Sequence, residues 1–111
     1  MAEYLYLFRG GGFRQLPPEQ MQQHMQKWTN WIADLGKRGQ FKAGDPLEDS
    51  GKQVRGRGKA VTDGPFAEAK DLVGGYLIVN AGSLDEAAEL ARGCPILDVD
   101  GGVEVRPIRK M

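Results

Sequence analysis

The segment that most restricts the fold is residues 3–9, which read Glu-Tyr-Leu-Tyr-Leu-Phe-Arg. If this segment is extended, its three aromatic side chains lie on one face and its two leucines on the other. A strand that is apolar on both faces needs cover on both. The segment therefore predicts a sheet with helices on one face and a second apolar surface against the other.

Two later segments have the periodicity of amphipathic helices. The first covers residues 17–38, where Pro17 and Pro18 suit the first turn and Gly39 follows the end. Its apolar residues recur at helical spacing: Met21, Met25, Trp28, Ile32 and Leu35. The second begins at Ser83, which forms a capping-box pattern with Glu86, and ends at Gly93. Its predicted buried stripe is Leu84, Ala87, Ala88 and Ala91.

The remaining segments predict strands. Residues 75–81 and 103–106 alternate clearly, and residues 41–47 form a shorter strand. Residues 51–61 are polar and interrupted by glycine, with weak alternation. The order is β-α-β-β-α-β, which predicts an α+β protein with a ferredoxin-like fold and an antiparallel sheet. Because the chain has 111 residues, we expect one domain over residues 1–111.

The alternation also assigns side chains to the two faces of the sheet. The set expected to face the helices is Leu5, Leu7, Leu77, Val79, Val103 and Val105. The set expected to face away is Tyr4, Tyr6, Phe8, Tyr76, Ile78 and Ile108. The second set is too apolar to stay in water, so the sequence predicts a homodimer that pairs through this face.

Charge and cysteine content exclude several classes of partner. Fifteen basic residues balance fifteen acidic ones, so no global positive field favours nucleic acid. The local run Lys52, Arg55, Arg57 and Lys59 fits a solvated hairpin, and it lacks the aromatic residues of a nucleic-acid surface. With one His and the lone Cys94, no metal and no cofactor are expected. The absence of a secretory signal, a membrane-spanning run and paired cysteines predicts a cytoplasmic protein.

Residues 61–70 read Val-Thr-Asp-Gly-Pro-Phe-Ala-Glu-Ala-Lys, and Gly74, Gly75 and Tyr76 follow. This run closely resembles the signature of the YCII-related family, in its DGPF-domain branch. The resemblance extends over nearly the whole chain. It implies a ferredoxin-like fold that dimerises into a dimeric α+β barrel.

The same resemblance does not supply a catalytic pair. Relatives in the broader family carry a His in the first helix and an Asp near the end of the second, a pair associated with acid and base work. Here the first position falls near Lys27 or Trp28, and the second falls on Cys94. The catalytic residues are therefore not assigned.

The DGPF run has two interpretations. In the structural one, Asp63 and Gly64 form a turn, Pro65 fixes its backbone and Phe66 anchors it. In the functional one, Asp63 accepts a ligand or acts as a general base beside Tyr76 and His24, while Lys70 balances an anion. His24 also fits a structural role in the first helix.

Two classes of function remain open from the sequence. The first is a small-molecule binder or modest enzyme whose pocket lies between the first helix, the DGPF loop and the sheet. The second is a noncatalytic interaction module beside transcription regulators. The resemblance suggests the second, because DGPF relatives are often associated with alternative sigma factors.

Overall fold

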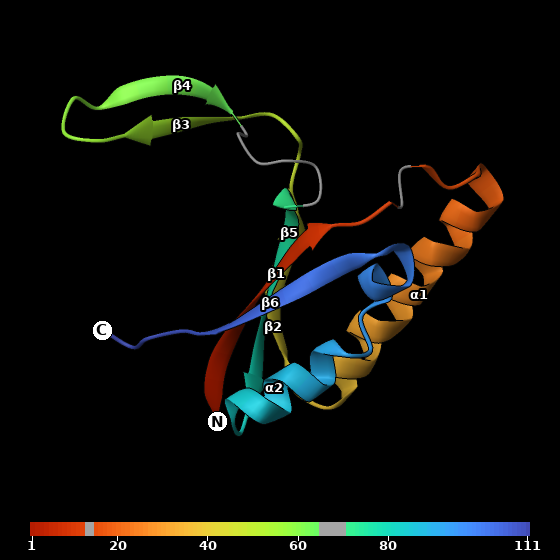
Figure 1. Ribbon diagram of the computed structural model, residues 1–111. Helices are drawn as coiled ribbons and strands as arrows, with labels where there is room; N and C mark the ends of the chain where they lie inside the picture. The colour runs from red at the N-terminus through yellow and green to blue at the C-terminus, as the bar shows by residue number, and fades with distance from the viewer. Residues whose placement is uncertain (13–14, 65–70) are drawn as a thin grey trace.

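A computed structural model of the chain describes residues 1–12, 15–64 and 71–111. Figure 1 shows its elements in chain order. They are β1 (Ala2–Gly10), α1 (Pro18–Lys37), β2 (Phe41–Pro46), β3 (Gly51–Arg55), β4 (Ala60–Gly64), β5 (Val73–Ala81), α2 (Leu84–Ala91), the 3₁₀ helix η3 (Pro95–Val99) and β6 (Gly101–Pro107). Pro65, Phe66 and Lys70 lie outside the described residues.

The main sheet has four strands in the order β2-β5-β1-β6, and all its neighbours are antiparallel. This is the strand order of a ferredoxin-like fold, so the predicted fold class is confirmed. The polar segment that the sequence left ambiguous forms β3 and β4, which pair only with each other. They make a hairpin that is inserted in the chain between β2 and β5.

The helices cover one face of the main sheet, and the assignment of β1 to the two faces was wrong. Tyr4, Tyr6 and Phe8 are buried toward the helices, whereas Leu5 and Leu7 lie half-buried on the other face. The register explains the difference. Tyr6 is the partner of Leu77 and of Val105, and cross-strand partners share a face. The helix-facing positions of Leu77, Val79, Val103 and Val105 are confirmed.

Residues on the opposite face form a surface that we call the open face. Leu5 pairs with Ile78, and Leu7 pairs with Tyr76. All four are half-buried in the single chain. Among the described residues, no helix packs over them. The expected outward position of Tyr76 and Ile78 is therefore confirmed, while the leucines replace the aromatic residues of β1.

Helix α1 packs an aromatic cluster against the sheet. Trp28 meets Phe8 edge-on with ring centroids 4.9 Å apart, and Trp31 stacks on Tyr6 at 6.2 Å. The predicted stripe needs one correction, because Met25 is exposed and His24 takes a buried position instead. His24 lies four residues before Trp28 and seven before Trp31, so it shares their face of the helix.

Helix α2 begins at the predicted cap residue Ser83, and Glu86 reaches back to Gly82, one residue before the N–H that a capping box uses. The backbone N–H of Glu86 donates to Ser83 Oγ at 3.1 Å, and the Glu86 carboxylate accepts from the Gly82 N–H at 2.8 Å. Its predicted stripe was only half right. Ala87 and Ala91 are buried, but Leu84 and Ala88 are exposed. The alanines allow a close approach to the sheet, and the Tyr6 hydroxyl donates to the Ala87 carbonyl at 2.5 Å.

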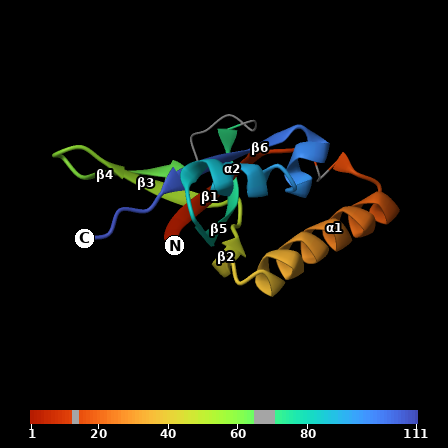
Figure 2. The ribbon, with the colours of Figure 1, turned by 90° about the horizontal axis from the view of Figure 1, so that it is seen from below.

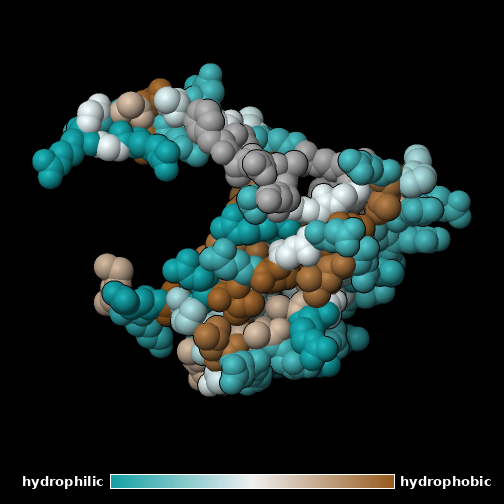
Figure 3. Space-filling view, in the orientation of Figure 1, coloured by the Kyte–Doolittle hydropathy of each residue, from teal (hydrophilic) through white to brown (hydrophobic). Residues whose placement is uncertain are grey.

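The β3–β4 hairpin projects away from the domain. Figures 1 and 2 show it on the opposite side of the main sheet from α1, and the C-terminal segment extends to the same side. In the space-filling view a wide gap separates the hairpin from the C-terminal segment (Figure 3). In the part of the chain that the structure describes, no helix is long and apolar enough to span a membrane.

Candidate functional site

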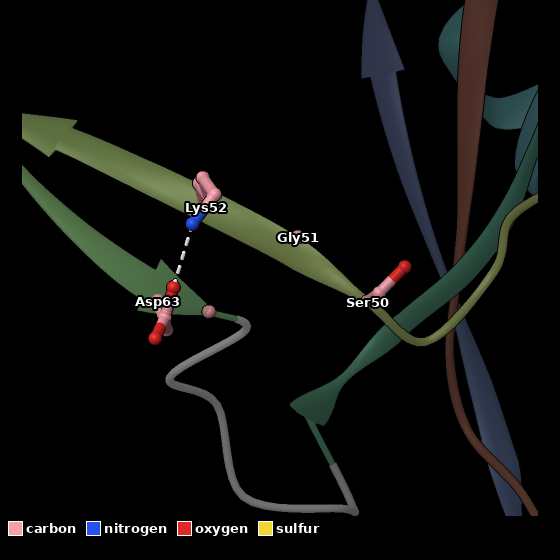
Figure 4. Close-up of a pocket in the computed structure, with 5 residues that line it drawn as sticks. Ser50, Gly51, Lys52 and Asp63 are labelled. Carbon is pink, nitrogen blue, oxygen red and sulfur yellow. Dashed lines mark hydrogen bonds and ion pairs between the residues drawn. The ribbon is translucent and has the colours of Figure 1, made fainter.

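One candidate site lies at the root of the hairpin. Gly51 and Gly64 face each other as the first and last partners of the β3–β4 ladder, and neither has a side chain to fill the space. An open hollow of about 470 Å³ remains there. Its lining consists of Ser50, Gly51, Lys52, Asp63 and Gly64 (Figure 4).

Lys52 and Asp63 form an ion pair across the hollow. They are cross-strand partners, and Lys52 Nζ lies 2.7 Å from Asp63 Oδ1. The side chains are 68% and 91% exposed, and such pairs contribute only about 0–1 kcal/mol to stability. The ammonium keeps donors to spare and the carboxylate keeps an oxygen to spare. The pair can therefore bind a ligand without disturbing the fold.

His24 belongs to the core beneath α1. Its side chain is buried, and its Nε2 accepts a hydrogen bond from the Trp28 indole N–H at 3.0 Å. Because the indole nitrogen can only donate, this Nε2 carries no proton while the bond is made. The geometry agrees with the structural interpretation of His24.

Tyr76 lies on the open face and contacts another residue that the sequence did not single out. Its hydroxyl donates to Asp45 Oδ2 at 3.2 Å, and the two residues are partners between β5 and β2. Leu47, two residues after Asp45, still bonds to Gly74 through its backbone N–H. Tyr76 and Asp45 are thus on the stretch of sheet from which the hairpin departs.

The structure does not bring the described candidates His24, Asp63 and Tyr76 together. His24 lies on the helix-covered side, Tyr76 lies on the open face, and Asp63 lies on the hairpin. Lys70 is outside the described residues. Asp63 lines a hollow at the hairpin root, but its neighbour there is Lys52, and no described residue of α1 lines that hollow. Sequence reasoning assigned Lys52 only to a basic run.

A second polar cluster lies on the open face around Glu104. Arg9 Nε lies 3.0 Å from Glu104 Oε1, and Arg106 Nη1 lies 3.3 Å from Glu104 Oε2. The hydrogen bond from Arg9, followed by that from Arg106, lowers the pKa of the Glu104 carboxyl below its usual value. Arg9 also donates to the carbonyl of Asp71 at 2.9 Å. This face therefore combines an apolar centre with fixed charges.

Two buried acids are held in their neutral forms. Burial raises the pKa of the Cys94 thiol to about 12, and burial raises that of the Tyr6 phenol to about 12 as well. A thiol needs its thiolate form to act as a nucleophile, so neutral pH leaves Cys94 unreactive. Among the described residues, no group of three or more His, Cys, Asp or Glu side chains could hold a metal ion.

Comparison with known proteins finds a sequence relative and a solved structure of similar fold. An uncharacterised protein of Rhizobium meliloti (strain 1021) is 43% identical over 49 residues, which are 43% of this chain and 40% of that protein. The match thus spans less than half of that relative's length. The solved structure of 5-chloro-2-hydroxyhydroquinone dehydrochlorinase (TftG) from Burkholderia phenoliruptrix AC1100, in complex with 2,5-dihydroxybenzoquinone, is also similar. Its TM-score is 0.51 at 18% identity, with coverage of 98% of this chain and 95% of the dehydrochlorinase.

The likeness to the dehydrochlorinase supports the fold alone. A sequence identity of 18% is too low to indicate a shared activity. The family comparison is broader, since the YCII-related domain matches residues 5–111. That range contains the Asp63-Gly64 run and both helices. The family resemblance seen in the sequence is confirmed: the chain belongs to the YCII-related domain family.

Proposed function

We propose that this protein is a homodimer that binds a small, oxygen-rich molecule in the hollow at the root of the hairpin. The observation that carries the proposal is the Lys52–Asp63 ion pair. It is exposed, it lines a hollow, and its Asp63 belongs to the signature run of residues 61–70. No other charged pair among those described combines these three properties.

The ion pair sets the class of ligand. The Lys52 ammonium can donate to a carboxylate, enolate or carbonyl oxygen, while Asp63 can accept from a neighbouring hydroxyl. A molecule that carries both kinds of group next to each other fits the pair. The dehydrochlorinase with the same fold was solved with 2,5-dihydroxybenzoquinone, a molecule of this kind. That likeness supports a small-molecule role by analogy of fold.

A thermal-shift screen against hydroxylated quinones, phenols and hydroxy acids tests the proposed ligand class. It compares the wild type with the variant Asp63→Asn. A ligand present at about a hundred times its dissociation constant adds about 2.7 kcal/mol to the free energy of unfolding. Each kcal/mol raises the midpoint by about 4–8 °C for a domain of this size. We expect at least one shift that the Asp63→Asn variant loses, because the amide cannot replace the charge.

The matched control is Asp98→Asn. Asp98 also forms an exposed ion pair, with Lys27 at 3.5 Å, but it lies on η3 away from the hairpin. This variant should keep every shift of the wild type. A hit that survives in Asp63→Asn would place its ligand elsewhere, and a library without hits would contradict the proposal.

The homodimer follows from the open face. Leu5, Leu7, Tyr76 and Ile78 form an apolar centre that no described element covers. Large apolar patches on soluble domains usually mark interfaces, and a twofold axis lets one patch cover its own copy. The charges around Glu104 then form the rim of the contact.

Light scattering at micromolar concentration tests this dimer. We expect a dimer for the wild type and a monomer for Leu7→Lys, because the substitution buries two ammonium groups close to the twofold axis. Met25→Lys serves as the control, since Met25 is exposed on the outer side of α1. A wild-type monomer would refute the dimer.

A further inference from the structure

The β3–β4 hairpin is an arm without a core of its own. It pairs with no strand of the main sheet, and it projects on the side of the open face, away from α1 (Figures 1 and 2). A two-stranded hairpin is only marginally stable in water unless one face packs on something. The described part of this chain supplies no such packing. A partner surface would supply the packing that the described residues do not.

One face of the arm is suited to that contact. Val54 and Val61 are cross-strand partners, and they are 65% and 62% exposed. Because side chains alternate along a strand, the Lys52–Asp63 pair lies on the same face as the two valines. Gln53 and Thr62 lie on the opposite face. Whatever covers the valines also covers the ion pair of the proposed site.

The charge of the arm indicates which partner fits. Residues 51–64 carry four basic residues and one acidic residue, which is a net charge of +3. The chain as a whole has fifteen of each kind, so the rest carries eleven basic and fourteen acidic residues, or −3. A neutral protein that separates its charge in this way is complementary to a second copy of itself.

The tip cations are available for such a contact. Arg55, Arg57 and Lys59 form no ion pair with any described residue, whereas Lys52 is held by Asp63. A nucleic-acid partner would need a basic surround, and the body of this chain is acidic. A second copy fits better, because the chain outside the arm is acidic in total and its apolar open face lies on the side to which the arm extends.

We propose that the hairpin is an exchange arm, which lies against the second copy of the dimer and completes the ligand site. In a twofold dimer, each arm contacts the body of the other copy, and each body receives one arm. Val54 and Val61 are then buried between the copies. The hollow beside Lys52 and Asp63, open in the single chain, is closed by the second copy, so ligand and dimer stabilise each other. This inference rests on the homodimer proposed above.

The test measures the dimer dissociation constant of the full chain by sedimentation in a dilution series. The variant Val54→Thr with Val61→Thr keeps shape and strand propensity but places two hydroxyl groups in the interface. We expect its dissociation constant to rise by about tenfold or more. The control, Gln53→Ser with Thr62→Ser, changes the opposite face of the same arm. It should stay within about twofold of the wild type by the same arithmetic.

Salt adds a second readout. Raising sodium chloride from about 50 mM to about 500 mM should weaken the wild-type dimer, since exposed charges are screened. The variant with Arg55→Gln, Arg57→Gln and Lys59→Gln should dissociate more readily at low salt and respond less to added salt. If the threonine variant has the same dimer dissociation constant as the wild type, the exchange-arm proposal is wrong, although the dimer itself still stands. A monomeric wild type would overturn both.

Discussion

Replacing Phe8 by Ala is expected to lower the free energy of unfolding by about 3–5 kcal/mol, as for other large-to-small core substitutions. Phe8 is 6% exposed and lies at the centre of the aromatic cluster. Its ring contacts Trp28, Trp31 and Tyr6 at centroid distances of 4.9, 6.3 and 6.4 Å. The two Trp rings are fixed by α1, so they cannot collapse into the space that the ring leaves.

Chemical denaturation measures this loss as a shift of the midpoint with an unchanged slope. All variants must be compared at one protein concentration, because the proposed dimer would make apparent stability depend on concentration. Phe41→Ala is the matched control: it removes the same side chain from edge strand β2, where Phe41 is 36% exposed. An equal loss in both variants would show that the aromatic cluster has no special role.

The aromatic cluster also shows where sequence reasoning reached its limit. Strand β1 was recognised, but both its faces are apolar, so alternation alone could not decide which one meets the helices. The two Trp residues of α1 decide it. They stack on aromatic rings more favourably than on leucine, and the Tyr6 hydroxyl finds a buried acceptor in the Ala87 carbonyl. These contacts join segments far apart in the sequence, which local periodicity does not report.

The hairpin was the least predictable element because it lies outside the main sheet. Strands that pack against no other described element of their own chain need no hydrophobic alternation, so the usual signal was weak. A signal for its pairing was present in Gly56 and Gly58, and Gly56 has a positive φ of 72° in the turn. A ladder around that turn places Lys52 opposite Asp63. Thus the partner of Asp63 could have been inferred from turn chemistry.

The candidate site was foreseen only in part. The family signature drew attention to Asp63, which lines the hollow at the hairpin root. Grouping it with His24 and Tyr76 required knowledge of which side of the sheet each occupies. His24 lies four residues before Trp28, and this spacing placed it in the buried stripe instead. The role of Asp63 and of Tyr76 in binding remains a prediction.

Gly44→Ala is the substitution of next largest expected effect. A Cβ atom at this position would lie 2.6 Å from the carbonyl oxygen of Tyr76 and 3.0 Å from the Cα of Leu77, and it would also meet the Leu77 side chain. Rotation of a side chain cannot relieve a contact with backbone. Strand β2 must therefore move away from β5, and overpacking of this kind costs about 1–3 kcal/mol.

The matched control for Gly44→Ala is Gly74→Ala on the neighbouring strand. A Cβ at Gly74 would meet no atom within 4 Å. Here the added methyl group only restricts the unfolded chain, so stability should stay the same or rise by about 0.4–1 kcal/mol. Comparing the two midpoints in urea separates a steric effect at Gly44 from a general effect of alanine in a strand. If Gly44→Ala also proved neutral, β2 would have to be less tightly held against β5 than its contacts indicate. The hairpin root, which continues from β2, would then be less rigidly positioned. The hollow at Asp63 would be less rigidly positioned as well.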